Sequence, residues 1–280
     1  MGEAGEIVRH YGLGDLRARL QEALENAGLG ASRLSPSNLA PLDQFHTRGL
    51  SATVELAQVL DIQPDTEVVD VGSGLGGPSR YLAATFDCRV HGIDLSPAFV
   101  VAATYLAERV GLAGKVAYDC GDAQAMPYES ERFDLAWTQH VAMNIADRAR
   151  LYGEVHRVLR PGGRFAIYDV VAGPGGPVHF PVPWSRGPST SFLLTPTDMQ
   201  SVLEHAGFRV VNWKDSSETG IAWFAEQRKA HAAAQAAGAR PPALGLHIAM
   251  GPDFPEMSAN LGRNLSERRI GLVQAVLERA

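Results

Sequence analysis

A short apolar stretch that runs into glycines is the feature that most constrains the fold of this chain. Residues 68–71 read Val-Val-Asp-Val, and residues 72–79 read Gly-Ser-Gly-Leu-Gly-Gly-Pro-Ser. The first part is typical of a short buried strand, and the proline suits the first turn of a following helix. The glycines have the spacing G-x-G-x-x-G, in which they permit positive φ and let a ligand approach the backbone. The stretch predicts a strand–loop–helix unit that binds a nucleotide-like cofactor, but the spacing alone does not select which one.

Two acidic residues narrow the choice of cofactor. Asp70 stands two residues before the first glycine, where a carboxylate suits an ammonium group better than a pyrophosphate. Asp94 ends a second apolar run, residues 90–93, at the position that binds ribose hydroxyls in doubly wound folds. A cofactor with one ribose, an amino group and no phosphate fits both acids. S-adenosylmethionine (SAM) has this composition.

Composition and charge limit the classes of partner. Of the 280 residues, 45% are hydrophobic and 20% are charged, and the formal net charge is −6. This balance is typical of a globular protein. Because there is no block of Lys and Arg, we expect no nucleic-acid partner. Cys88 and Cys120 lie far apart without metal-ligand spacing, so we expect reduced thiols and no metal site.

Neither the amino terminus nor the apolar runs resemble a targeting signal. Residues 1–6 lack the basic and apolar blocks of a secretory signal. No apolar run approaches the ~18 residues of a membrane span. We therefore expect a cytoplasmic protein with no membrane span.

Strand and helix patterns alternate from residue 67 onward, which predicts an α/β fold with a doubly wound, mostly parallel sheet. We expect strands over 67–71, 89–94, 115–119, 133–138, 164–170 and 208–213. We expect helices over 14–28, 78–85, 97–111, 147–159, 197–206 and 221–237. Apolar residues from Met257 to Leu277 recur at helical spacing and predict one or two packing helices, which could form a homodimer contact. A seventh strand must fall around 216–225 or later, and the pattern does not fix its position.

The chain divides by pattern into three parts. We expect an N-terminal helical cap over 1–62, a cofactor-binding domain over 63–225 and a C-terminal helical extension over 226–280. Residues 171–196 are rich in Gly and Pro. Such a long loop in a compact domain is usually functional or disordered, and its aromatic residues, among them Trp184, predict an ordered lid on the substrate side.

Four motifs resemble those of the class I SAM-dependent methyltransferases, in order and in spacing. They are Asp70–Gly74, Gly121–Ala123, Phe133–Trp137 and Leu159–Gly163. The resemblance implies a Rossmann-like fold and methyl transfer from SAM. With residues 42–53 ahead of this core, the chain is similar to the small-molecule group of sarcosine/dimethylglycine and phosphoethanolamine N-methyltransferases, which implies an acceptor amine of the glycine/sarcosine type. Quinone, tocopherol and sugar methyltransferases share much of the core, so O- or C-methylation of a small natural product or quinone is the alternative.

The resemblance also implies which residues hold the cofactor. Those at its methionine end are Thr47, Asp70 and Gln139, while Gly72 and Gly74 lie in the loop against which the cofactor packs. Those at its adenosine end are Asp94 at the ribose, Leu95 over the adenine face, and Asp122 and Ala123 at the adenine edge. Asp70 would hold the amino group, and Thr47 would contact the carboxylate.

The catalytic candidates are His46, His140 and Asn144. An ammonium or hydroxyl acceptor needs a base, and His suits this task near neutral pH. Related groups carry a His after the fourth strand where this chain has Asn144, so their base does not transfer directly. Because ligands of open α/β sheets lie beyond the carboxyl ends of the strands, we expect residues 44–46, His140, Asn144 and the loop 181–192 to enclose one acceptor pocket.

Two other classes of function remain open. A nicotinamide-dependent reductase can use the same glycine spacing, although Asp70 and the motif at Gly121–Ala123 disfavour it. A non-catalytic SAM-binding protein is the second. Tests of cofactor binding and of product release separate both from a methyltransferase.

Overall fold

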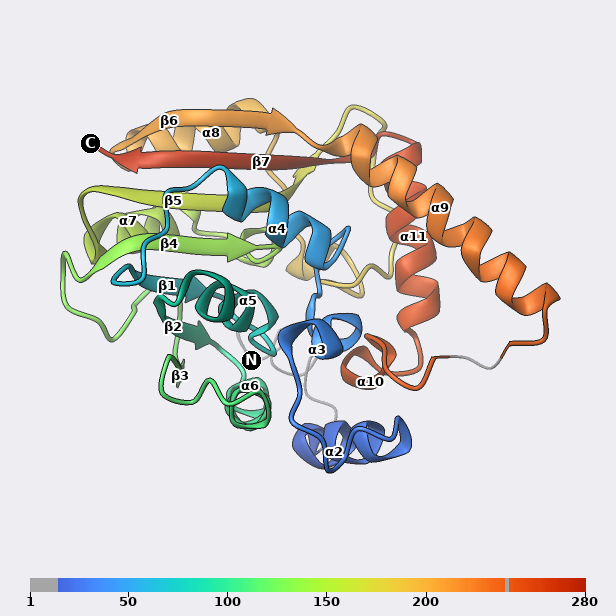
Figure 1. Cartoon of the computed structure of the whole chain (residues 1–280). Helices are drawn as coiled ribbons and strands as arrows, with labels where there is room; N and C mark the ends of the chain where they lie inside the picture. The colour runs from blue at the N-terminus through green and yellow to red at the C-terminus, as the bar shows by residue number, and fades with distance from the viewer. Residues whose placement is uncertain (1–14, 240–241) are drawn as a thin grey trace.

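The computed structural model describes residues 15–239 and 242–280. Figure 1 shows a central sheet with helices on both faces and with α2 and α3 gathered to one side of it. The residues that were expected to lack a secretory signal, 1–6, lie outside the described part of the chain. In the described ranges no helix is long and apolar enough to cross a membrane.

Seven strands form one sheet in the order β3-β2-β1-β4-β5-β7-β6. Their bounds are β1 Glu67–Val71, β2 Arg89–Asp94, β3 Val116–Cys120, β4 Phe133–Gln139, β5 Leu159–Ala172, β6 Phe208–Asp215 and β7 Ile270–Arg279. The first five pair in parallel, and β7 runs antiparallel to both of its neighbours. The predicted doubly wound, mostly parallel α/β sheet is thus confirmed, and all six expected strands are present.

The last strand corrects the expectation for the C-terminus. Residues 254–266 are helical as predicted, but residues 270–279 form β7 in the sheet and not a packing helix. β7 pairs with β5 and β6 along its edges, its side chains join the hydrophobic clusters on both faces of the sheet, and residues 272–277 are all buried. A strand buried on both faces shows a continuous apolar run without alternation, which cannot be told from a buried helix by periodicity. The three-part division of the chain stays a prediction.

Ten helices were assigned over the described ranges. They are α2 Leu16–Asn26, α3 Pro36–Asp43, α4 Leu50–Gln58, α5 Gly77–Phe86, α6 Pro97–Arg109, α7 Arg148–Val158, α8 Pro196–His205, α9 Ser217–Ala236, α10 His247–Met250 and α11 Phe254–Ser266. No helix was expected over residues 36–43, which form α3. Its start is fixed by a capping box, in which Asn38 Oδ1 accepts a hydrogen bond from Ser35 N at 2.9 Å.

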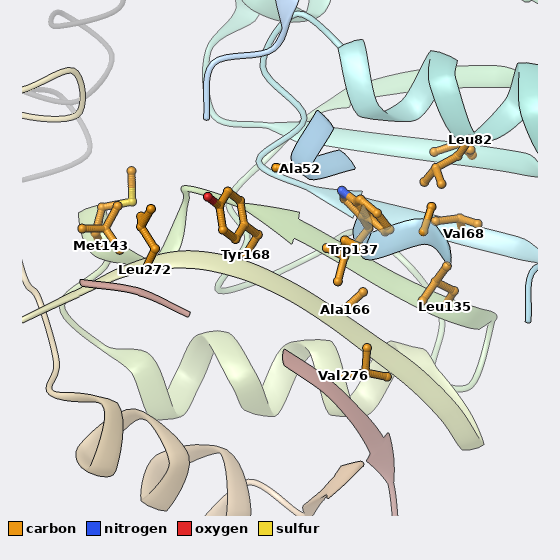
Figure 2. Close-up of a cluster of buried hydrophobic side chains, with 14 of the residues drawn as sticks. Ala52, Val68, Leu82, Leu135, Trp137, Met143, Ala166, Tyr168, Leu272 and Val276 are labelled. Atoms are coloured by element: carbon orange, nitrogen blue, oxygen red, sulfur yellow. The ribbon is translucent and has the colours of Figure 1, made fainter. Parts of the chain in front are cut away.

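The sheet separates two hydrophobic clusters. One packs residues of β1, β4, β5 and β7 against α4, α5, α9 and α11, and Figure 2 shows part of it, with Trp137 and Tyr168 among its largest side chains. The other lies on the opposite face, under α7 and α8, and includes Tyr152 and Phe165. A third cluster joins α2 and α3 to α6 and α10. Covered on both faces, the sheet holds the carboxyl ends of its parallel strands in fixed positions.

A buried ion pair ties the N-terminal cap to the sheet domain. Arg80 Nη2 on α5 lies 2.7 Å from Asp43 Oδ2 at the end of α3, and the two side chains are 0% and 1% exposed. The same guanidinium donates to Ala103 O on α6. The cap is therefore fastened directly behind the glycine loop that precedes α5.

Candidate functional site

A cavity of about 180 Å³ lies at the carboxyl ends of β1, β2 and β4. It is lined by Phe45, Gly72, Gly74, Ile93–Ser96, Phe99, Gly121–Gln124, Gln139–Val141, Asn144 and Ile145. Seven of the nine residues predicted to bind the cofactor are in this lining, and Thr47 and Asp70 are not. The cavity stands where ligands of open α/β sheets bind.

The glycine loop after β1 needs glycine for two separate reasons. Gly72 has a φ of 72°, a backbone conformation that residues other than glycine rarely adopt. A Cβ there would also lie 2.4 Å from Val141 Cγ2. Gly72 N donates to Ile93 O at 2.8 Å, which holds the loop against the end of β2. The loop and the strand end thus form one wall of the cavity.

Asp94 is fixed by two backbone amides. Its Oδ2 accepts from Gly74 N at 2.8 Å and its Oδ1 accepts from Ser96 N at 2.9 Å. Burial raises the pKa of this carboxyl, and the two amide hydrogen bonds oppose the rise. Each carboxylate oxygen keeps a further lone pair, so the side chain can accept from a pair of ribose hydroxyls while it positions the glycine loop.

Replacing Asp94 with Ala should weaken SAM binding roughly tenfold to hundredfold, because hydroxyls that lose a charged acceptor lose about 1.5–3 kcal/mol. Titration calorimetry with SAM measures this. A urea denaturation curve of the variant is the control, because the amides of Gly74 and Ser96 lose their acceptor as well. A folded variant that binds SAM as tightly as the wild type would refute the ribose assignment.

The adenine side of the cavity combines a polar turn with aromatic walls. Asp122 Oδ1 accepts from Gln124 N at 2.9 Å, so the turn after β3 presents the acid and the Ala123 amide side by side. The rings of Phe45 and Phe99 stack with centroids 5.7 Å apart. Phe99 was missed by the sequence reasoning, although its place in the first turn of a helix after Asp94 was a usable signal.

Asp70 lies beneath the loop instead of on the cavity wall. Its Oδ2 accepts from the Ser79 hydroxyl at 2.5 Å at the start of α5, and the residue is only 2% exposed. Burial raises the pKa of Asp70 to about 7, with the Ser79 hydrogen bond opposing the rise. The predicted contact with the methionine amino group therefore stays a prediction.

The raised pKa of Asp70 predicts a pH dependence of stability. The unfolded residue titrates near 3.8 and the folded one near 7, so the folded state binds the proton more tightly. Its contribution to stability is complete below pH 3.8 and is lost as the pH rises through 7. Relative to the wild type, Asp70→Asn should therefore gain stability between pH 5 and pH 8. Urea denaturation at both values measures this, and a difference that does not change with pH contradicts it.

His46 is not on the cavity wall. It is 5% exposed, its Nε2 donates to Gly49 O at 2.9 Å, and the same nitrogen lies 3.1 Å from Thr53 Oγ1. Burial lowers the pKa of His46 to about 4. Because its Nε2 carries the proton and is engaged, His46 holds the start of α4 instead of facing the cavity. The prediction that it serves as a base finds no support in this geometry.

His140 does line the cavity, in an unusual backbone conformation. Its φ is 53°, and its amide donates to Tyr168 O at 2.8 Å. No described residue hydrogen-bonds its Nε2, and its ring lies 5.2 Å from that of Tyr168. Burial keeps the pKa of His140 well below its usual range, so the ring is neutral at pH 7. Non-glycine residues at positive φ cluster at functional sites, and His140 is the better placed of the two histidines.

Gln139 offers a fixed hydrogen-bond donor. Its Oε1 accepts from Trp137 Nε1 at 3.0 Å and from Thr53 Oγ1 at 3.1 Å. Its buried Nε2 has no partner among the residues described. Because both acceptor contacts fix the amide orientation, Nε2 is available to a carboxylate or another acceptor group of a ligand.

Asn144 lines the cavity, but its amide holds the loop after β5. Its Nδ2 donates to Trp184 O and to Thr190 O, both at 2.8 Å. No residue of 171–196 lines the cavity, so the expectation that residues 181–192 enclose the acceptor pocket is not met by this structure. The reason is that Val182 and Trp184 pack into the hydrophobic cluster under α9 and α11. Of the expected pocket residues, Phe45, His140 and Asn144 line the cavity.

Comparison with known proteins agrees with this geometry. Residues 69–167 match the family described as Methyltransferase domain. The matched part of the chain contains β2 to β4, most of β1 and β5, and most of the residues that line the cavity. The methyltransferase GfsG of Streptomyces halstedii is 35% identical over 136 residues, which are 49% of this chain and 48% of that protein. The glycine/sarcosine/dimethylglycine N-methyltransferase of Actinopolyspora halophila is 28% identical over 178 residues, 64% of this chain and 32% of that protein.

The methyltransferase fold extends over the whole chain. The solved structure of geranyl diphosphate C-methyltransferase from Streptomyces coelicolor A3(2) superposes with a TM-score of 0.71 at 16% identity, covering 100% of this chain and 98% of that one. The chain spans about half of the first curated relative's length and a quarter to a third of several others'. At these identities the likeness establishes the domain and its fold, and the acceptor must be argued from the site.

Proposed function

We propose that this chain is an enzyme that uses SAM to methylate a small-molecule acceptor. The observation that supports this best is the composition of one cavity. Its lining brings Asp94 and the Asp122–Ala123 turn together with the glycine loop, Gln139 and His140. Asp94 and the turn suit an adenosine, and Gln139 and His140 suit a polar, reacting end.

The residues present fit SAM chemically. Asp94 keeps free lone pairs for the ribose hydroxyls, and Gln139 Nε2 is a buried donor without a partner among the described residues, as a carboxylate would require. When bound, SAM supplies a methyl group on a positively charged sulfur, which becomes a neutral thioether as the acceptor takes the methyl group. The protein's share is alignment of the two reactants, worth up to several kcal/mol of the barrier.

His140 is the residue we assign as proton acceptor. Its Nε2 is unpartnered in the described structure and belongs to a neutral ring, so it can take a proton from an ammonium or hydroxyl acceptor. The low pKa makes it a weak base. It also keeps the ring uncharged next to the position proposed for a cationic cofactor. Asn144 holds the neighbouring loop in this assignment.

For the acceptor, we propose an amine of the glycine/sarcosine type. The similarity to the glycine/sarcosine/dimethylglycine N-methyltransferase, which extends over 64% of this chain, supports this choice. O- or C-methylation of a small natural product or quinone is the alternative, since the cavity itself contains no residue that selects nitrogen over oxygen or carbon.

Binding and turnover together test the proposal. Titration calorimetry should give SAM and S-adenosylhomocysteine (SAH) dissociation constants below a millimolar and no binding of NADH. A panel of amines, phenols and thiols should then reveal an acceptor through SAH release. Binding of NADH without SAM would favour the reductase. Tight SAM binding with no SAH release from any acceptor would favour a non-catalytic SAM-binding protein.

A further inference from the structure

Buried polar atoms without partners gather behind His140, one layer beyond the cavity. They are Arg48 Nη1 on the loop before α4 and the Tyr168 hydroxyl on β5. Thr47, which precedes Arg48 in the chain, has an unpartnered Oγ1 as well. A buried donor that lacks an acceptor is costly, and native structures rarely leave one without a ligand or water. Several in one place point to a bound group that supplies acceptors.

Contacts between the rings and the loop place these atoms together. The Tyr168 ring lies 6.0 Å from that of His46 and 5.2 Å from that of His140. The Arg48 guanidinium is close enough to oppose the burial that raises the pKa of Tyr168. In Figure 2 the Tyr168 ring lies beyond the labelled side chains of Trp137 and Ala166, on the side of Met143 and Leu272. The Arg48 guanidinium, which interacts with the Tyr168 hydroxyl, thus lies beside Tyr168 and near His140.

The charge of this region is positive. Arg48 Nη2 pairs with Glu55 Oε2 at 2.6 Å, and Lys214 pairs with the other oxygen of the same carboxylate. One carboxylate therefore serves two cations, while Arg48 Nη1 stays without a hydrogen bond in the described structure. Arg48 and Tyr168 offer two neighbouring donors beside an excess positive charge. This combination suits a carboxylate, since Arg favours such oxyanions.

We propose that Arg48 and Tyr168 bind the carboxylate of the methyl acceptor. The proposal rests on the proposed function and gives its acceptor a second recognition element. In a glycine-type acceptor the nitrogen and the carboxylate share one carbon, so a carboxylate on Tyr168 leaves the nitrogen within reach of the neighbouring His140. Tyr168 is 1% exposed in this structure, so the proposal requires the segment that carries Arg48 to move and admit the acceptor.

SAM also has a carboxylate, so the two sources must be distinguished. Gln139 Nε2, on the cavity wall, is the unpartnered donor that the described structure offers to the methionine end. Arg48 and Tyr168 are absent from the cavity lining. On this basis the proposal assigns their donors to the acceptor.

Equilibrium binding to the SAH-loaded full chain tests the proposal without requiring turnover. The probes are glycine and sarcosine, methylammonium and dimethylammonium as the same amines without the carboxylate, and acetate as the carboxylate alone. We expect the three carboxylates to bind at least tenfold more tightly than the two amines. Arg48→Gln and Tyr168→Phe should each remove most of this difference, and Arg48→Lys should restore part of it.

Matched controls separate recognition from folding. Tyr152→Phe removes an equally buried hydroxyl that also lacks a partner in the described structure, but Tyr152 belongs to α7 on the other face of the sheet. It should leave the binding of every probe unchanged. SAM affinity should stay within about threefold of the wild type in all variants, because a lost charged hydrogen bond would cost tenfold or more.

Three outcomes overturn the proposal. The first is equal binding of the amines with and without a carboxylate. The second is carboxylate binding that Arg48→Gln leaves intact. The third is a parallel loss of SAM affinity in the variants, which would assign the donors to the cofactor. If the wild type binds SAM and releases SAH with an acceptor that lacks a carboxylate, this inference fails while the proposed function stands.

Discussion

Replacing His140 with Asn should lower the rate of SAH formation by about a hundredfold or more, as expected when a general base is lost. Asn is chosen because it tolerates positive φ better than Ala, and the φ of residue 140 is 53°. The side-chain amide of Asn cannot act as a base, whereas the Nε2 atom of the imidazole can accept a proton. SAM affinity should change little, since no contact between this side chain and the cofactor is assigned. Initial rates at saturating acceptor and calorimetry with SAM measure the two quantities.

The matched control is His46→Asn. It removes the donor to Gly49 O, so it should lower stability and alter acceptor binding. The pH dependence of turnover should keep the wild-type shape if His140 is the base. In His140→Asn the fall of the rate at low pH, which reports protonation of the base, should disappear. A His140→Asn enzyme with nearly wild-type turnover, or a greater loss and a changed profile in His46→Asn, would reverse the assignment of the two histidines.

Replacing Asp43 with Ala should lower the free energy of unfolding by about 3–5 kcal/mol, because it leaves the Arg80 charge buried and unpaired. The two side chains are 1% and 0% exposed and lie 2.7 Å apart. Burial raises the pKa of Asp43 and the Arg80 charge opposes the rise, so the carboxyl depends on its partner to stay ionised. Urea denaturation followed by circular dichroism measures the loss.

A surface ion pair provides the comparison. Arg89 is 65% exposed and lies 3.4 Å from Glu67, and exposed pairs of this kind contribute about 0–1 kcal/mol. Arg89→Ala should therefore be nearly neutral. Asp43→Ala should also weaken SAM binding, because the Asp43 backbone packs directly on Gly77 at the start of α5. Equal small effects of Asp43→Ala and Arg89→Ala would show that the buried pair does not fasten the cap.

Local patterns predicted most of the sheet and one half of the site. The motifs around Gly72, Asp94 and Asp122 lie at the ends of consecutive parallel strands, and such ends meet at one edge of the sheet. Seven predicted cofactor residues therefore line one cavity. The prediction succeeded here because the strand ends are set by short-range turns, and their relative positions follow from parallel pairing.

The acceptor half could not be predicted in the same way. His46 and His140 are indistinguishable as residue types, and only the hydrogen bonds of His46 with Gly49 and Thr53 separate them. The loop after β5 was expected over the pocket, yet its Val182 and Trp184 belong to the hydrophobic cluster that includes residues of α11. Arg48 attracts attention only because Tyr168, far away in the sequence, comes to lie beside it.

By itself the sequence determined the strand–loop–helix unit at residues 67–86, the parallel core and the nature of its ligand, because each depends on contacts between near neighbours and on glycine at fixed places. Tertiary structure alone decided the rest. Residues 270–279 form a strand that pairs with both β5 and β6, and its side chains are buried on both faces of the sheet. The buried polar atoms were brought together in the same way, since the burial of a side chain is a property of all the elements that surround it.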